Sequence, residues 1–220
     1  MKSKHDFRFI SKHSPEVRAA YDDLIQLLSL VHDDLKHRYK FEHKVVGSYE
    51  RNMITHDLKS NVGFDLDVNI TTHEDEEKYS AKDVKLSFKR SLDKFSAQFG
   101  FDPAEDSTRV LTIKVKDKKN SKILHGIDFA FIYDYTDDDG YDCQKYIHFN
   151  KKQNCYGWQE QSQGFYMLPE KYEWLLDNDY KDELDTMYLK MKNKNNDPDK
   201  HSRSIFAEAV SACYNLYYDE

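Results

Sequence analysis

Strict alternation of apolar and polar residues from Phe64 to Ile70 is the feature that most restricts how this chain can fold. Successive side chains of a β-strand point to opposite faces of the sheet, so the segment FDLDVNI predicts a strand with one face in a hydrophobic core. The other face carries Asp65, Asp67 and Asn69. The chain is therefore expected to build a sheet with an apolar back and an acidic front.

Two long helices are predicted around that strand. Ser14 followed by Pro15 is typical of a helix start, and apolar residues then recur at steps of three and four to about Tyr39. A second amphipathic pattern predicts a helix from Glu76 to Phe99, which ends at Gly100. Both helices have an apolar stripe with which to cover one face of a sheet.

Further strands are expected before and after the second helix. Residues 43–48 form a short strand pattern that ends at Gly47, followed by one or two helical turns over residues 49–55. Residues 109–115 and 122–133 are predicted to form a β-hairpin, and residues 141–149 are predicted to add another strand.

The C-terminal third of the chain is predicted to be helical. The helical pattern begins at Pro169 and continues in two pieces, over residues 182–192 and 202–218. We therefore expect an α+β fold with a mixed-sheet core and its N-terminal helix over residues 1–150, and a helical C-terminal part over residues 151–220.

Composition excludes several classes of protein. With a formal net charge of −7, the chain is not expected to coat extended nucleic acid. No apolar run approaches the roughly 18 residues that span a bilayer, so no membrane partner is expected. The three cysteines show no C-x-x-C spacing, which indicates reduced thiols and a cytoplasmic protein.

Asp65 and Asp67 are the first candidate site. Two carboxylates at i and i+2 of a strand point the same way, so both can reach one divalent cation. The spacing alone is a weak signal, since 27 aspartates predict about three Asp-x-Asp triplets by chance. Four occur, and only this one lies on an alternating apolar strand. The alternative is a polar sheet face that simply meets water.

Asp128 is the second candidate, because it interrupts a strongly apolar strand over residues 122–133. An isolated buried acid needs a partner, which is either a lysine or arginine, or a cation shared with Asp65 and Asp67. The small residues Gly126 and Ala130 flank Asp128 on its own face and leave room there for a substrate or metal.

Gly47 and Ser48 are the third candidate. A strand that ends in Gly-Ser and enters a helical turn directs backbone N–H groups and a hydroxyl at one spot, which suits a phosphate. The pair alone is a weak signal. Its value lies in the order along the chain: Gly-Ser, then Asp-x-Asp on the next strand, then a lone Asp on a later apolar strand.

In that order, the stretches VVGSYERNMI, FDLDVNI and HGIDFAFIYD resemble the nucleotidyltransferase fold shared with DNA polymerase β. GSYERNMI is similar to the branch that contains oligoadenylate synthases, CCA-adding enzymes and bacterial cyclic-oligonucleotide synthases. The resemblance covers about residues 43 to 133. It implies a nucleotidyltransferase core, with the active site in a cleft closed by the helical C-terminal part.

The resemblance also implies residue roles. Asp65, Asp67 and Asp128 would be the catalytic residues and the ligands of two Mg²⁺ ions, with Mn²⁺ as a possible substitute. Gly47 and Ser48 would hold the β- and γ-phosphates of a nucleoside triphosphate such as ATP. Arg51 would add a phosphate contact, unless it is simply solvated.

The implied function is transfer of a nucleoside monophosphate from a nucleoside triphosphate to a hydroxyl acceptor, with release of pyrophosphate. The chain is short for a cyclic-oligonucleotide synthase and shows no RNA-binding domain, which favours a nucleotide or a small molecule as the acceptor. The main alternative is a catalytically silent nucleotide-binding or protein-interaction module with the same fold. A glycosidase-type carboxylate pair is disfavoured, because neighbouring aspartates on one strand face lie too close together.

Overall fold

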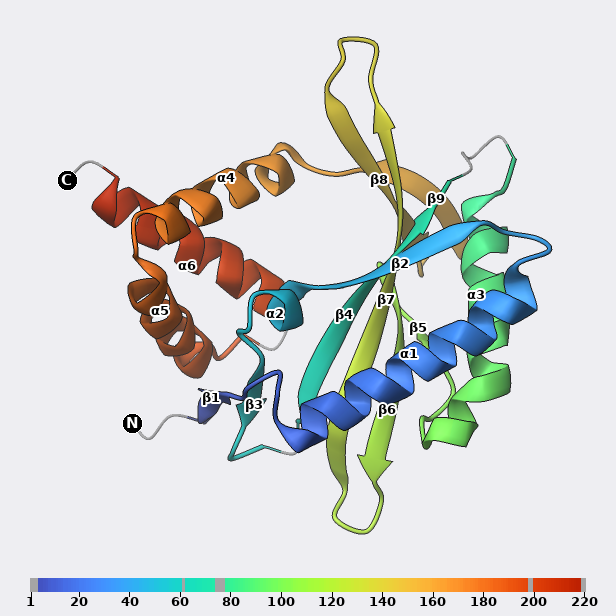
Figure 1. Cartoon of the computed structure of the whole chain (residues 1–220), viewed down its shortest axis with the longest axis horizontal. Helices are drawn as coiled ribbons and strands as arrows, with labels where there is room; N and C mark the ends of the chain where they lie inside the picture. Colours follow the sequence, from blue (N-terminus) through green and yellow to red (C-terminus); the bar gives the residue numbers. More distant parts are fainter. Residues whose placement is uncertain (1–3, 61, 74–77, 198–199, 219–220) are drawn as a thin grey trace. The chain divides into compact units, whose positions relative to one another are not determined.

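The computed structural model describes residues 4–60, 62–73, 78–197 and 200–218. The chain forms two compact units. The first unit comprises residues 1–9, 55–60 and 162–220, and the second comprises residues 10–54 and 61–161. Figure 1 shows the elements of both units.

The second unit is built on a seven-stranded mixed sheet with the strand order β2-β4-β7-β6-β5, to which β8 is joined through β7 and β9 through β8. Its strands are β2 (Phe41–Val46), β4 (Phe64–Thr72), β5 (Glu105–Asp106), β6 (Val110–Asp117), β7 (Lys122–Thr136), β8 (Asp142–Asn150) and β9 (Cys155–Glu160). Strands β4 and β7 are parallel, and the other pairs are antiparallel. The predicted α+β class with a mixed sheet is therefore confirmed.

Two helices bury the apolar side of this sheet. Helices α1 (Pro15–Leu35) and α3 (Ala81–Phe95) pack against each other (Figure 1). Their apolar residues join one buried cluster with the alternate residues of β4, as the sequence predicts. The β4 members of that cluster are Phe64, Leu66, Val68 and Ile70.

Both long helices are shorter than predicted. Helix α1 ends at Leu35 rather than near Tyr39, because the charged residues 36–38 form a turn before β2. Tyr39 is nevertheless buried. Helix α3 begins at Ala81, where the Ser80 hydroxyl accepts from the Asp83 backbone N–H, and the predicted start at Glu76 lies outside the described residues. A 3₁₀ turn, η1 (Ser96–Phe99), follows α3, and Gly100 then ends the helical segment as predicted, with φ of +77°.

Two predicted elements have different bounds in the structure, and one strand was not predicted. The strand expected over residues 43–48 ends at Val46, since Gly47 already opens the helical turn α2 (Gly47–Glu50). The helical turns expected over residues 49–55 stop at Glu50, and β3 (Thr55–Asp57) follows. The connection after residue 150 contains strand β9, which pairs along β8.

The first unit joins both ends of the chain. Its helices are α4 (Gln163–Asp177), α5 (Lys181–Lys194) and α6 (Ser202–Tyr217). Helix α4 begins at Gln163, six residues before the predicted start of the helical pattern at Pro169. Strand β1 (Phe7–Phe9) pairs antiparallel with β3. Within the described residues, no helix is long and apolar enough to cross a membrane. The proposed division into a core over 1–150 and a closing part over 151–220 stays a prediction.

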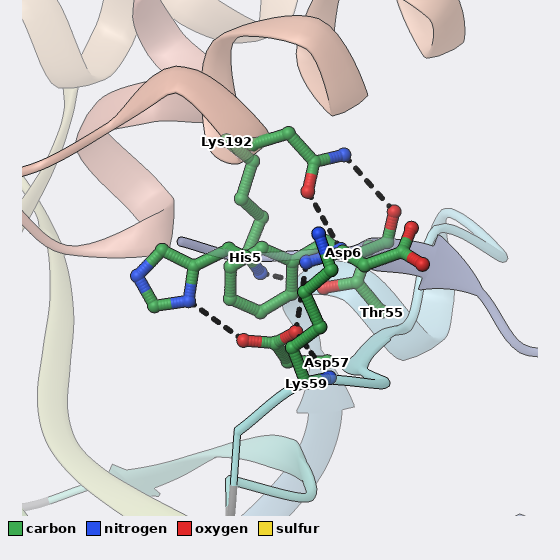
Figure 2. A network of polar contacts seen from close by, with 8 residues as sticks. His5, Asp6, Thr55, Asp57, Lys59 and Lys192 are labelled. Atoms are coloured by element: carbon green, nitrogen blue, oxygen red, sulfur yellow. Dashed lines mark hydrogen bonds and ion pairs between the residues drawn. The ribbon is translucent and has the colours of Figure 1, made fainter. Parts of the chain in front are cut away.

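Polar contacts hold these distant segments together (Figure 2). The buried carboxylate of Asp57 bonds His5 Nδ1 at 2.6 Å and accepts from the Asp6 backbone N–H at 2.9 Å. The buried ammonium of Lys192 donates to the Thr55 hydroxyl at 2.5 Å. Lys192 thus links α5 to β3 within the same unit.

Candidate active site

The register of β4 and β7 brings two of the predicted acids side by side. Asp67 and Asp128 are direct Cα partners on these parallel strands, and Asp65 is opposite Gly126. The intervening Leu66 and Ile127 are fully buried, so they occupy the opposite face. Because neighbouring strands lie about 4.8 Å apart, the three acids occupy adjacent positions on one face of the sheet.

Gly126 makes room for a carboxylate rather than for a substrate. A methyl group placed on its Cα would overlap Oδ1 of Asp65. The small residues beside Asp128 were predicted to leave room for a metal or a substrate. At Gly126 the side chain of Asp65 occupies that space, so the Asp65 carboxylate lies over the backbone of β7.

Gly47 lies against the second acid. Its predecessor Val46 is the register partner of Asp67, and a methyl group on Gly47 would overlap Oδ2 of Asp67. The backbone of Gly47 also has a φ of +69°, a conformation that favours glycine. Both constraints explain why glycine is needed here, and they place the start of α2 next to the acids.

Ser48 and Arg51 follow in the same short turn. Ser48 is half-buried, and its carbonyl accepts from the Met53 backbone N–H at 2.8 Å. Arg51 is also half-buried, and its backbone N–H bonds back to the carbonyl of Gly47. The chain therefore brings Gly47 and its turn to the acidic positions of the sheet, while the phosphate roles of Gly47, Ser48 and Arg51 stay predictions.

Thr112 is a neighbour of the site that the sequence analysis missed. Thr112 lies on the adjacent strand β6, and its hydroxyl donates to Oδ1 of Asp128 at a distance of 2.5 Å. A basic partner or a shared cation was predicted for Asp128, and the Thr112 hydroxyl is a further partner of a different kind. The predicted hairpin indicated that β6 and β7 are neighbours. Only their pairing register shows that Thr112 lies opposite Asp128.

A β-bulge sets that register. The pairs Asp117–Lys122 and Lys116–Ile123 are followed by Val115–His125, so Leu124 of β7 falls between two pairs. If Leu124 were instead paired with Val115 and the register continued unbroken, Thr112 would be opposite the buried Ile127 instead of Asp128. A shift of one residue turns a side chain to the other face of the sheet, so the bulge decides that Thr112 meets the acid.

The three acids fit a divalent cation in donor type and in strand position. Carboxylate oxygens are the hard ligands that Mg²⁺ and Mn²⁺ prefer, and adjacent positions on one sheet face allow such oxygens to be shared. Across the described ranges, however, no group of three or more His, Cys, Asp or Glu side chains is already gathered as a metal cluster. The fit therefore rests on register and on donor chemistry.

The chain has a nucleotidyltransferase fold, with a mixed sheet, a Gly-Ser turn beside Asp67 and Asp67 paired with Asp128. Among solved structures with this fold, the chain is similar to bacterial cyclic dinucleotide synthases. No family model matches the sequence, and no curated protein matches it.

Two structural neighbours illustrate the likeness. The cyclic dinucleotide synthase CdnE of Elizabethkingia meningoseptica, with GTP and Apcpp, matches 95% of this chain and 73% of its own, with a TM-score of 0.54 and 11% identity. DncV of Vibrio cholerae in its 3′-deoxy ATP bound form matches 92% of this chain with a TM-score of 0.57 and 15% identity. This chain spans about half (54%) of that DncV chain.

Proposed function

We propose that this protein transfers a nucleoside monophosphate from a nucleoside triphosphate to a hydroxyl acceptor and releases pyrophosphate. One observation carries the proposal: Asp67 has Asp128 as its register partner on one side and Gly47 against its carboxylate on the other. Two acids and the turn expected to hold a phosphate therefore meet at one point of the sheet. Solved structures with this fold hold GTP or ATP analogues, which supports a nucleoside triphosphate as the substrate.

Each residue group has a distinct task in this proposal. The backbone of Gly47 and the hydroxyl of Ser48 bind the β- and γ-phosphates, and Arg51 adds a contact to the same phosphates. Asp65, Asp67 and Asp128 hold two Mg²⁺ ions, which would neutralise charge that develops on the α-phosphate and the leaving pyrophosphate. Asp128 also helps to take the proton of the attacking hydroxyl.

A second nucleotide is the acceptor that we favour. One solved DncV structure holds the linear intermediate pppA(3′,5′)pG, in which a nucleotide is joined to the 3′ hydroxyl of another. A small molecule with a free hydroxyl is the other acceptor class. The net charge of −7 disfavours an extended nucleic acid at this site.

Incubation with each α-labelled nucleoside triphosphate and Mg²⁺ or Mn²⁺, alone and with pooled hydroxyl acceptors, tests the proposal. The variant Asp65→Asn/Asp67→Asn should abolish labelled product and pyrophosphate. A matched control is Asp137→Asn/Asp139→Asn, an Asp-x-Asp pair in the β7–β8 turn, where Asp137 accepts backbone N–H groups that an asparagine oxygen can also accept. This control should retain full activity.

The alternative function is a catalytically silent module that binds nucleotides or a partner protein. This alternative is favoured if the protein binds a nucleoside triphosphate but forms no labelled product from any of the four nucleoside triphosphates (ATP, GTP, CTP and UTP), even with acceptors present. Absence of metal-dependent binding of every nucleoside triphosphate contradicts both functions and leaves the acidic face of the sheet without a role in nucleotide chemistry.

A further inference from the structure

Thr112 completes a row of polar residues that crosses the sheet. The row contains Asp67 on β4, Asp128 on β7, Thr112 on β6 and Glu105 on β5, each the Cα partner of the next. Only Thr112 in this row is a neutral hydrogen-bond donor. Its hydroxyl donates a hydrogen bond to Oδ1 of Asp128.

The position of this hydroxyl is restricted from several sides. Leu111 and Ile113, the neighbours of Thr112 on β6, are fully buried and hold the strand against the core. The bulge at Leu124 aligns Thr112 with Asp128, and Gly63 makes the bulge possible, since a side chain there would overlap the carbonyl of Leu124. The β-branched side chain of threonine is itself stiff at χ1, which limits the hydroxyl to few directions.

A hydroxyl can orient a carboxylate without neutralising it. A lysine at this position would cancel the charge that Asp128 needs to attract a cation. The nearest lysine of the same strand, Lys114, is instead paired with Glu105 at 2.7 Å, and this hydrogen bond holds the pKa of the Glu105 carboxyl below its usual range. Strand β6 therefore supplies a neutral donor to Asp128, while the lysine two residues further along that strand has Glu105 as its acidic partner.

We propose that Thr112 is a positioning residue for Asp128: its hydroxyl fixes the direction of that carboxylate so that Asp128 can act as a metal ligand. This inference rests on the proposed function, because it assigns Thr112 a role only through Asp128. Residues that orient a metal ligand in this way typically contribute about 10- to 100-fold to metal affinity or activity.

Binding of Mn²⁺ alone to the full chain, measured from the electron paramagnetic resonance signal of free Mn²⁺, is the test. Thr112→Val removes the hydroxyl at nearly constant shape, Thr112→Ala is the second removal variant, and Thr112→Ser restores the donor. Asp128→Asn gives the reference loss. Thr72→Val is the matched control, because Thr72 is a threonine of β4, on the other side of β7, whose hydroxyl donates to the Ile132 carbonyl of β7. Thermal unfolding shows whether each variant is folded.

We expect Thr112→Val and Thr112→Ala to weaken Mn²⁺ binding about 10-fold or more, with Thr112→Ser close to the wild type and Thr72→Val unchanged. In the double variant with Asp128→Asn, Thr112→Val should have no further effect. In the turnover assay, Thr112→Val should raise the metal concentration needed for half-maximal rate, and excess metal should recover part of the rate.

Three outcomes contradict the inference. Wild-type affinity in the folded Thr112→Val and Thr112→Ala variants, with a clear loss in Asp128→Asn, overturns the role of Thr112 and leaves the proposed function intact. Equal losses in Thr112→Ser and Thr112→Val show that the hydroxyl is not responsible. Unchanged Mn²⁺ binding in Asp128→Asn removes Asp128 from the metal site, which overturns this part of the proposed function together with the role of Thr112.

Discussion

The carboxylate of Asp65 occupies the space that a side chain at position 126 would need. Asp65 and Gly126 are register partners on the parallel strands β4 and β7. The carboxylate of Asp65 therefore lies over the backbone of Gly126 on β7, the strand that also carries Asp128. This relationship connects a sequence feature, glycine in an apolar strand, to the position of a candidate catalytic group.

Replacement of Gly126 by alanine should reduce activity more than stability. The added methyl group meets Oδ1 of Asp65, the end of a side chain that can turn away, so the backbone of β7 need not move. Under the proposed function we expect at least a 10-fold loss of nucleotide transfer, with a change in the free energy of unfolding of about 1 kcal/mol or less. Steady-state rates and urea unfolding measure the two effects.

Gly157→Ala in β9 is the control for Gly126→Ala, because no described atom lies within 4 Å of a methyl group built there. This control should keep its activity. An active Gly126→Ala variant would show that the position of Asp65 over β7 is not required for the reaction.

Gly47→Ala should lose both stability and activity, and Gly100→Ala separates the two causes. Both glycines have positive φ, +69° and +77°, so alanine at either position costs about 1 kcal/mol of folding free energy. Only the methyl group at Gly47 also meets the Asp67 carboxylate. We expect similar losses in urea unfolding, with transfer activity lost in Gly47→Ala alone. Equal activity in the two variants would contradict the placement of Gly47 at the site.

Lys85 and Asp106 form an ion pair inside the second unit. The side chain of Lys85 is fully buried, and its ammonium lies 2.9 Å from Asp106 Oδ1 and 2.7 Å from the Ser107 carbonyl. Burial lowers the pKa of Lys85, and the Asp106 carboxylate opposes this shift. Removal of one partner leaves the other charge buried, so Asp106→Asn should destabilise the protein by about 3 to 5 kcal/mol.

The double variant Lys85→Met/Asp106→Asn should lose less stability than the sum of the two single variants, since no uncompensated ammonium remains. Lys89→Met, which breaks a partly exposed pair of the same helix with Asp93, should cost less than about 1 kcal/mol. Chemical unfolding of the wild type and of the four variants (Lys85→Met, Asp106→Asn, their double variant and Lys89→Met) measures these values. Strict additivity would show that Lys85 and Asp106 do not interact energetically.

Stability should fall at mildly acidic pH because of His125. Its ring lies 5.5 Å from that of Phe64 and 5.6 Å from that of Phe101, and its Nε2 atom is buried without a hydrogen-bond partner among the residues that the structure describes. Burial lowers the pKa of His125 below its ordinary value of 6.5. The unfolded chain therefore binds more protons than the folded chain below about pH 6.5, and the free energy of unfolding decreases as the pH falls from there through the folded-state pKa.

His125→Phe should flatten this dependence, because phenylalanine keeps an aromatic ring beside Phe64 and Phe101 and carries no titrating group. Urea unfolding of both proteins between about pH 7 and pH 5 measures the difference. The pKa of His43 is also lowered, by desolvation, so His43 contributes a slope of the same sign that remains in the variant. An unchanged slope in His125→Phe would show that His125 does not titrate differently in the folded protein.

Local patterns were sufficient to predict much of the second unit. The alternation from Phe64 to Ile70 predicted β4 and its buried face, and the hairpin pattern predicted β6 and β7. Gly100 was identified as a helix end. Each of these features depends on the side chains of a few consecutive residues, so the sequence carries the signal directly.

Features that depend on distant residues were missed. Strand β1 exists because Phe7–Phe9 pairs with Thr55–Asp57, and a three-residue strand has no periodicity of its own to recognise. Strand β9 likewise becomes a strand by pairing with β8. For such short segments, the hydrogen bonds and burial provided by a partner decide the conformation, and intrinsic propensity is a minor contribution.

The candidate site shows the same division. The sequence by itself determined which residues are acids on a sheet face, since Asp65, Asp67 and Asp128 each lie on a recognisable strand. Only the tertiary structure decided that Asp67 faces Asp128 and that Thr112 donates to it. Register is decided by the sum of pairing and packing energies along whole strands, and one bulged residue, Leu124, is enough to change which side chains meet.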